Sequence, residues 1–379
     1  MKTNELAHAI AQETIEYRRD IHRHPEPSME EFRTTDRICE ELDKLGVSYK
    51  RMKPTGVIAE IKGTKGESDK IVMIRGDIDA LSIREKTDLP FKSVNEGFMH
   101  ACGHDMHAAV LFGVLQRLAA EPAFRGTILG LFQPGEECNP GGASLVLAEK
   151  PFDGYDIRAV VGEHVESQME VGTLGFRAGK YMAASDELRF RIHGSGGHGA
   201  MRRQLKDPVA AGAEFLTRLI ALNGEECVLS IGRVEAAGAT NIVPDEVYME
   251  GTLRTFDEQE RKIIHRRIGN IAAEIDSRYG VSTRVDISHG YPCVVNDELL
   301  VKRAVTLAKA DSLKVEMLPL RTTAEDFGFY CRQYPSIFYR LGVGTAAGRS
   351  HTGTFNPDER AIDTGIGFMY RLALQILEK

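Results

Sequence analysis

The chain has 379 residues, the length of about two domains, and its 42% hydrophobic and 27% charged residues are typical of a globular protein. Its 48 basic and 55 acidic residues give a formal net charge of −7, which argues against a general nucleic-acid-binding surface, and no apolar run approaches the roughly 20 residues of a membrane span. The polar N-terminal region also lacks the apolar stretch of a signal peptide. We therefore expect a cytoplasmic protein with no nucleic-acid or membrane partner.

The first half of the chain alternates between helical and strand-like patterns. Ser28, followed three residues later by Glu31, indicates a capping box at the start of the second helix. Helices are predicted at 5–19, 28–45, 106–120 and 142–149. Strands are predicted at the apolar runs 57–61, 71–74, 127–132 and 159–161. Strands that are almost continuously apolar and separated by helices predict a largely parallel sheet covered on both faces.

From about residue 184 the order becomes strand, helix, strand, strand, helix, strand, which is the pattern of a split βαβ sandwich. These elements are predicted at 187–193, 208–222, 227–234, 246–253, 258–278 and 282–287. Afterwards the α/β pattern returns, with helices predicted at 298–310 and 362–377 and a strand at 337–341. We therefore predict an α/β domain formed by residues 1–183 and 290–379, interrupted by a sandwich domain at 184–289.

One of the six cysteines lies in a cluster of possible metal ligands. No pair of cysteines has C-x-x-C spacing, which argues against a disulfide framework and a four-cysteine zinc site. Cys102, however, lies in the segment His100-Ala-Cys102-Gly-His104-Asp-Met-His107. Thiolate and imidazole are ligands that borderline divalent metals prefer. Gly103 permits a tight turn that would face Cys102 and His104 toward one ion at the start of a helix.

Two adjacent carboxylates follow the predicted strand at 127–132. Neighbouring side chains of an extended backbone point to opposite sides, so one of Glu136 and Glu137 would bind a metal while the other faces a metal-bound water. Two adjacent acids in a solvated loop are the alternative interpretation.

Further polar side chains are expected near the same edge of the sheet. His164 and the pair Asp77-Ile-Asp79 are predicted to lie just beyond apolar strands, and His351 lies in the loop after the strand at 337–341. Each of these alone is often structural. Their convergence at the carboxyl ends of the strands, where open α/β sheets place their active sites, favours a functional site.

The sandwich segment holds three more candidates. His198 lies in the glycine-rich turn Gly194-Ser-Gly-Gly-His-Gly-Ala, Asn241 precedes Ile-Val-Pro, and Arg254 ends a predicted strand. An arginine with an asparagine nearby can hold a carboxylate by charge-assisted hydrogen bonds. A surface ion pair is the alternative for Arg254.

The segments RGDIDAL, HACGHDMH, FQPGEE, GEHV, GGHGA, TNIVPD, GTLRTF, EDFGFY and SHTGTFNPDE, taken in order, resemble the N-acyl-amino-acid amidohydrolases. This is the hippurate hydrolase and indole-acetyl-amino-acid hydrolase branch of the aminoacylase/carboxypeptidase G metallopeptidases. The resemblance runs from about Arg18 to the C-terminus. It implies an α/β catalytic domain interrupted by a ferredoxin-like lid, through which such chains often form homodimers.

The resemblance also implies a dinuclear site for two divalent ions, zinc or manganese, with cobalt or nickel as further possibilities. Its implied ligands are Cys102, His104, Glu137, His164 and His351, with Cys102 standing where other branches use a bridging aspartate.

The other roles are implied in the same way. Glu136 is similar to the general base, and Asp79 to the acid that orients a histidine ligand. His198 resembles the lid histidine that stabilises the oxyanion from the partner subunit, and Asn241 and Arg254 resemble the clamp on the substrate's α-carboxylate.

The implied reaction is hydrolysis of an N-acyl-L-amino acid to a carboxylic acid and an amino acid. The alternatives are a dipeptidase, an N-acetyldiaminopimelate deacetylase, or a non-catalytic binding protein on the same fold. Two segments depart from the family pattern, Met201-Arg202-Arg203 and Cys138-Asn139-Pro140. The two arginines favour either an acidic substrate or a solvated loop, and we prefer the loop.

Overall fold

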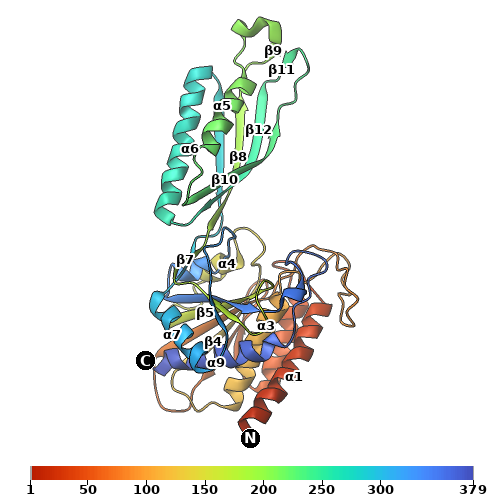
Figure 1. The fold of residues 1–379 in the computed structure, drawn as a ribbon, viewed down its shortest axis with the longest axis vertical. Coiled ribbons are helices and arrows are strands. Elements are labelled where there is room, and N and C mark those ends of the chain that lie inside the picture. The colour runs from red at the N-terminus through yellow and green to blue at the C-terminus, as the bar shows by residue number, and fades with distance from the viewer. Residues whose placement is uncertain (1, 379) are drawn as a thin grey trace. The chain divides into compact units, whose positions relative to one another are not determined.

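The computed structural model describes residues 2–378, which form two compact units (Figure 1). Unit 1 contains the residues up to Gly179, Val295–Pro319 and the residues from Phe329 onward. Unit 2 contains Lys180–Val294 and Leu320–Gly328. None of the helices in the described part of the chain combines the length and the apolar character that a membrane span needs.

Unit 1 is built around an eight-stranded sheet with a parallel centre. The strand order is β1 (Ser48–Arg51), β2 (Val57–Lys62), β4 (Thr127–Gln133), β3 (Lys70–Asp77), β5 (Asp156–Glu166), β16 (Ser336–Gly342), β6 (Leu174–Phe176) and β15 (Val315–Met317). The pairs β4–β3, β3–β5, β5–β16 and β6–β15 are parallel, and the others are antiparallel. The sheet is therefore mixed, a correction to the predicted largely parallel sheet, in part because the short connection from β1 to β2 permits only antiparallel pairing.

The helices of this part of the chain agree with the predicted pattern, except for the short α8, which was not predicted. They are α1 (Lys2–Arg23), α2 (Phe32–Leu45), α3 (His104–Ala120), α4 (Gly142–Ala148), α7 (Glu298–Ala310), α8 (Gly328–Cys331) and α9 (Ala361–Glu378), with a 3₁₀ turn η2 (Thr345–Ala347). The sequence patterns predicted the long helices because each carries an apolar face. The short strands β1, β6 and β15 were not predicted.

The predicted capping box at Ser28 and Glu31 is wrong. Helix α2 begins at Phe32, and Glu31, at its N-cap, makes no capping hydrogen bond through its side chain. Instead the Ser28 hydroxyl donates to Asp79 Oδ2 at 2.6 Å, and Glu31 Oε1 accepts from the Gly135 N–H at 2.8 Å. Both side chains therefore form tertiary contacts that reach the loops after β3 and β4.

Unit 2 has the predicted sandwich order of strands and helices. Its antiparallel sheet has the order β10 (Cys227–Glu235), β12 (Glu246–Thr255), β8 (Ala184–His193) and β13 (Ser282–His289), and it packs against α5 (Pro208–Ile220) and α6 (Glu258–Tyr279). The small elements β9 (Gly197–His198), η1 (Gly199–Gln204) and β11 (Ile242–Val243) complete the unit, while β7 (Gly179–Met182) pairs with β14 (Val294–Asn296). Alternating burial along β8 leaves one face of the sheet covered by helices and the other polar.

Candidate metal centre

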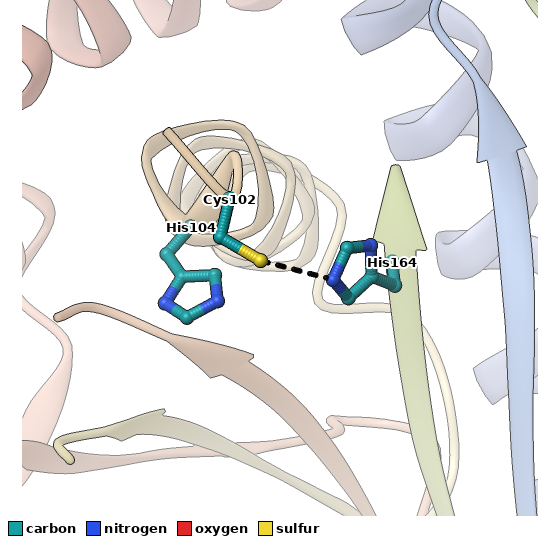
Figure 2. A group of neighbouring side chains, drawn as sticks. All are labelled: Cys102, His104 and His164. Carbon is teal, nitrogen blue, oxygen red and sulfur yellow. Dashed lines mark hydrogen bonds between the residues drawn. The ribbon is translucent and has the colours of Figure 1, made fainter. Parts of the chain in front are cut away.

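The predicted metal ligands meet at one edge of the unit 1 sheet. The Sγ atom of Cys102 lies 3.4 Å from Nε2 of His164 and 3.4 Å from Nε2 of His351 (Figure 2 shows the first contact). Glu137 Oε1 lies 3.4 Å from Nε2 of His351. Residues separated by up to 249 positions in the sequence thus converge on one thiol.

The ligand atoms form overlapping groups that share Cys102. The ligand atoms of Cys102, His104 and His164 all lie within 4.8 Å of one another, and so do those of Cys102, Glu137 and His351. Thiolate, imidazole and carboxylate are together a donor set for borderline divalent cations. The arrangement therefore fits two neighbouring cations with the thiolate between them.

A glycine makes the approach of Cys102 to His104 possible. Gly103, at the N-cap of α3, has a φ of 96°, in the left-handed region. A Cβ atom at this position would lie 2.5 Å from Cγ2 of Val165, closer than any packed contact allows. Glycine therefore both permits the turn and lets the loop pack against β5.

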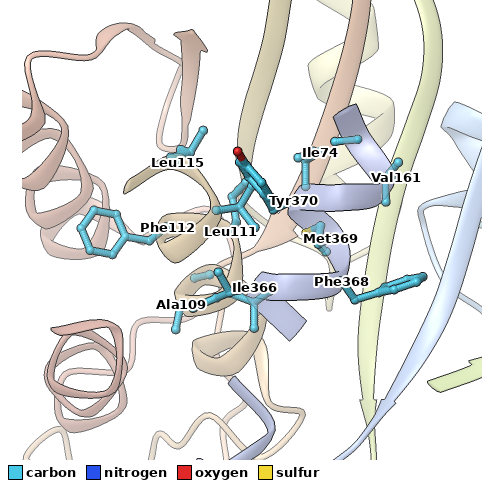
Figure 3. Close-up of a cluster of buried hydrophobic side chains, with 14 of the residues drawn as sticks. Ile74, Ala109, Leu111, Phe112, Leu115, Val161, Ile366, Phe368, Met369 and Tyr370 are labelled. Carbon is cyan, nitrogen blue, oxygen red and sulfur yellow. The ribbon is translucent and has the colours of Figure 1, made fainter. Parts of the chain in front are cut away.

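Helix α3, which carries His104 and His107, is a rigid support. Of its 17 residues 14 are buried, so it is apolar on nearly all sides and lies in the centre of the unit. Figure 3 shows its side chains, among them Leu111 and Phe112, packed in one cluster with Ile366 of α9 and with Ile74 and Val161 of the sheet. Buried, close-packed helices hold their side chains in single positions.

Asp79 and a backbone carbonyl orient the imidazole rings of two candidate ligands. Nδ1 of His104 donates to Asp79 Oδ1 at 3.0 Å, so that Nε2 of His104 is the atom left for a metal. The same carboxylate accepts from the Glu137 N–H at 2.9 Å. In His164, Nδ1 donates to the carbonyl of Val165 at 2.7 Å, and Nε2 faces the Cys102 sulfur. Each ring therefore presents Nε2 to the centre.

The electrostatics of the centre also fit a cation. Burial raises the pKa of the Cys102 thiol and of the Glu137 carboxyl, and burial together with Arg340 lowers the pKa of His164. Nε2 of His104 is buried and makes no hydrogen bond among the described residues. A divalent cation would stabilise the thiolate and the carboxylate and would supply the partner that this nitrogen lacks.

Two predicted details of the site are wrong. Glu136 and Glu137 lie in a turn, not in extended backbone, and an oxygen of each carboxylate lies within 4.8 Å of the other and of a ring nitrogen of His104, instead of the two pointing to opposite sides. His164 lies inside β5, two residues before its end, instead of beyond it. The apolar run 159–161 covers only the middle of β5, so the sequence pattern did not show where this hydrogen-bonded strand ends.

Two neighbouring residues, His107 and Asp77, lie in the predicted motifs but were given no role from the sequence. His107 Nδ1 donates to Asp77 Oδ1 at 2.6 Å, and Asp77 Oδ2 pairs with Arg75 Nη1 at 2.6 Å. Both the imidazole and the carboxylate are buried.

The three sandwich candidates do not come together within one chain. His198 is exposed on β9, and Asn241 is exposed in the turn just before the neighbouring strand β11, where the Gly199 N–H donates to the Asn241 carbonyl at 2.9 Å. Asn241 lies before the first residue of β12, Glu246, whereas Arg254 lies eight residues further along that strand, about 26 Å from Glu246 at roughly 3.3 Å per residue. The sheet of unit 2 thus separates Arg254 from Asn241.

Comparisons with known proteins agree with this centre. The profile of peptidase family M20/M25/M40 matches residues 73–375. An N-acetyldiaminopimelate deacetylase of Exiguobacterium sibiricum is 34% identical over 92% of this chain and 95% of its own, and an N-acetyl-L-cysteine deacetylase of Bacillus subtilis is 34% identical over 97% and 89%. The crystal structure of the Bacillus subtilis protein YXEP, a dinuclear metal binding peptidase from the M20 family, superposes with a TM-score of 0.87 at 34% identity over 98% of this chain and 99% of that one. The predicted fold class is thereby confirmed.

Proposed function

The chain belongs to peptidase family M20/M25/M40, and from that premise we propose that it hydrolyses the amide bond of N-acyl-L-amino acids with the help of two divalent cations. Family membership confirms the resemblance found in the sequence and makes the chain a hydrolase of non-peptide amide bonds. The single observation that carries the proposal is the convergence of thiol, imidazole and carboxylate atoms on Cys102.

We assign the two cations to the predicted ligands. Cys102, His104 and His164 would hold one ion, and Cys102, Glu137 and His351 the other. When bound, such ions lower the pKa of a coordinated water and polarise the amide carbonyl. The thiolate favours zinc, and manganese, cobalt or nickel also fit the mixed ligands.

Glu136 is the proposed general base. Its Oε2 atom lies 4.0 Å from Nε2 of His104, so the carboxylate stands beside a ligand atom of the centre. From there it would take a proton from the attacking water and deliver it to the leaving amine. Asp79 would act through His104 and the backbone of Glu137, both of which it holds by hydrogen bonds.

The relatives support a small acyl group. Both of those named above are deacetylases of amino acids, so acetyl is the first acyl group to test. N-Acetyldiaminopimelate is the second candidate substrate, since one of these relatives carries that name. A dipeptidase is the remaining alternative.

We further propose that unit 2 is the lid and that two copies pair through it. The edge strand β10 exposes Val228 and Val234, which supports a partner at this edge. Because the sheet separates Arg254 from Asn241 within one chain, a carboxylate clamp that uses both residues needs Asn241 from a second copy. His198, the neighbour of Asn241, would come from that copy too.

The proposal is tested with purified protein loaded with zinc or manganese. Release of free amino acid is measured from matched N-acetyl and N-benzoyl amino acids, from N-acetyldiaminopimelate and from dipeptides. We expect turnover of N-acetyl amino acids that a chelator abolishes and added metal restores. Cleavage of dipeptides alone would favour the dipeptidase, and a loaded protein that cleaves no substrate of the panel would be a binding protein.

A further inference from the structure

At the end that carries His164, β5 pairs with β16 on one side, but its pairing with β3 on the other side has already stopped. Pairing of β3 with β5 runs from Lys70–Asp156 to Arg75–Gly162, whereas pairing with β16 continues to Glu166. Backbone N–H groups alternate between the two sides of a strand. The Val160 N–H donates toward β16, to the Pro335 carbonyl at 3.0 Å, so the Val165 N–H, five residues later, faces the side that β3 has left.

His107 occupies that side. The Val165 N–H donates to Nε2 of His107 at 2.9 Å, in the place where a strand would otherwise accept. An N–H donor at Nε2 requires that Nε2 carries no proton, so Nδ1 of His107 carries it and donates to Asp77 Oδ1 at 2.6 Å. The ion pair between Asp77 and Arg75 holds this carboxylate in turn.

This geometry separates His107 from the metal ligands. Asp77, His104 and His107 also present ligand atoms within 4.8 Å of one another, which by distance alone would suggest a further cation position. Both ring nitrogens of His107 are already engaged, however, one by Val165 and the other by Asp77. The ring therefore has no lone pair left for a metal.

We propose that His107 is a positioning residue that fixes His164 for the metal centre through the backbone of Val165. The inference rests on the proposed role of His164 as a ligand. His107 holds the N–H of Val165, and the carbonyl of Val165 holds Nδ1 of His164 at 2.7 Å. Without His107, a buried N–H group loses its acceptor, and the strand end shifts to find another. Loss of such an outer contact typically weakens metal binding about 10- to 100-fold.

Three substitutions of His107 distinguish a positioning role from a role in packing alone. In His107→Gln the side-chain oxygen reaches the place of Nε2 and can accept from Val165. In His107→Asn the amide ends short of it, and His107→Phe fills the space without an acceptor. Gln116→Leu is the matched control, because Gln116 is a buried polar residue of the same helix that bonds Thr14 and Glu13, away from the centre.

Metal-free protein is titrated with cobalt(II), and stoichiometry, affinity and the visible spectrum are measured without substrate. We expect His107→Asn and His107→Phe to bind one of the two ions about 10- to 100-fold more weakly and to change its spectrum. The cobalt affinity and spectrum of His107→Gln should be closer to those of the unaltered protein than the affinity and spectrum of His107→Asn are. Gln116→Leu should lower the melting temperature but keep both cobalt affinities.

Unaltered affinity and spectrum in His107→Phe would overturn the proposal. If His107→Phe does not fold, the comparison of His107→Gln with His107→Asn tests the proposal instead. Identical cobalt titrations of these two variants would also overturn it. Because the readout is metal binding, a chain that binds cobalt as expected but cleaves no amide would contradict the proposed function and leave the role of His107 intact.

Discussion

The candidate metal centre of unit 1 and the tip of unit 2 hold their candidate residues in opposite ways. The tip is formed by β9, η1 and the turn before β11, which carries Asn241. At the centre, His104 and His164 are each fixed by a second contact, from Asp79 and from the Val165 carbonyl. At the tip, His198 is exposed on a two-residue strand and Asn241 in a turn, and among the described residues the ring of His198 accepts just a local bond, from the Ala200 N–H at 3.2 Å.

The difference indicates which part is preorganised. Rings held by a second contact, as in His104 and His164, need little rearrangement when a cation binds, because the folding of unit 1 has already oriented them. The exposed ring of His351 is the exception within the centre. Exposed residues on a short turn cost little to fold, but they acquire a defined position only when a partner or a substrate contacts them. Substitutions of the candidate ligands should therefore change metal binding, and substitutions at the tip should change turnover alone.

Cys102→Ala should have the largest effect, because it removes the atom that both ligand groups share. We expect loss of both metals and of all metal-dependent turnover, measured by elemental analysis and amino acid release. Cys102→Asp, which restores an anionic ligand, should retain more metal than the alanine variant. Cys39→Ala, at a buried cysteine of α2, is the control and should keep full occupancy. Full occupancy in Cys102→Ala would refute ligation by the thiol.

Glu136→Gln should separate catalysis from metal binding within the same centre. The amide keeps the shape of the side chain but cannot take a proton, and general acid–base catalysis typically contributes about 10²–10⁴-fold. We expect kcat to fall by a factor in this range with unchanged metal content. Wild-type turnover would exclude Glu136 as the base.

His198→Ala should lower kcat by about 10²–10³, the usual cost of losing one oxyanion donor. Metal content and melting temperature should not change, because the side chain is exposed. A drop in metal content would contradict the prediction that substitutions at the tip change turnover alone.

Mixing the two inactive variants tests where His198 acts. In a mixed dimer of His198→Ala and Glu136→Gln, one site combines an intact Glu136 with an intact His198 from the other chain. Co-expression should therefore restore activity if the histidine is supplied by the partner. Activity that stays at the level of the separate variants would place His198 in its own chain's site or outside catalysis.

The sequence predicted the long elements well, because burial leaves a periodic apolar pattern along them. The strand, helix and turn order of unit 2 follows from such patterns, as in the alternating burial of β8. The candidate residues were singled out by residue type and by their places beside apolar runs, since few side chains suit a borderline metal. Their assignment as the ligands of a dinuclear site came from the resemblance to the amidohydrolase family.

What the sequence could not predict are contacts that depend on tertiary neighbours. Ser28 and Glu31 have the spacing of a capping box, yet they bond Asp79 and Gly135, because spacing alone cannot distinguish a local from a distant acceptor. The role of His107 depends on where β3 stops pairing with β5, which no local pattern records.

The double substitution Arg202→Ala with Arg203→Ala should have the smallest effect. Both side chains are exposed on η1, which buries none of its residues, and within the described chain neither guanidinium forms an ion pair. Surface substitutions of this kind usually change the free energy of unfolding by no more than about 0.5 kcal/mol, so the fold should be kept. We therefore expect kcat/KM to change little, and equally, for N-acetyl derivatives of neutral and of acidic amino acids. A fall in kcat/KM confined to the acidic substrates would show instead that Arg202 and Arg203 recognise a second negative charge of the substrate. The exposed tip would then determine substrate specificity, although it is not preorganised.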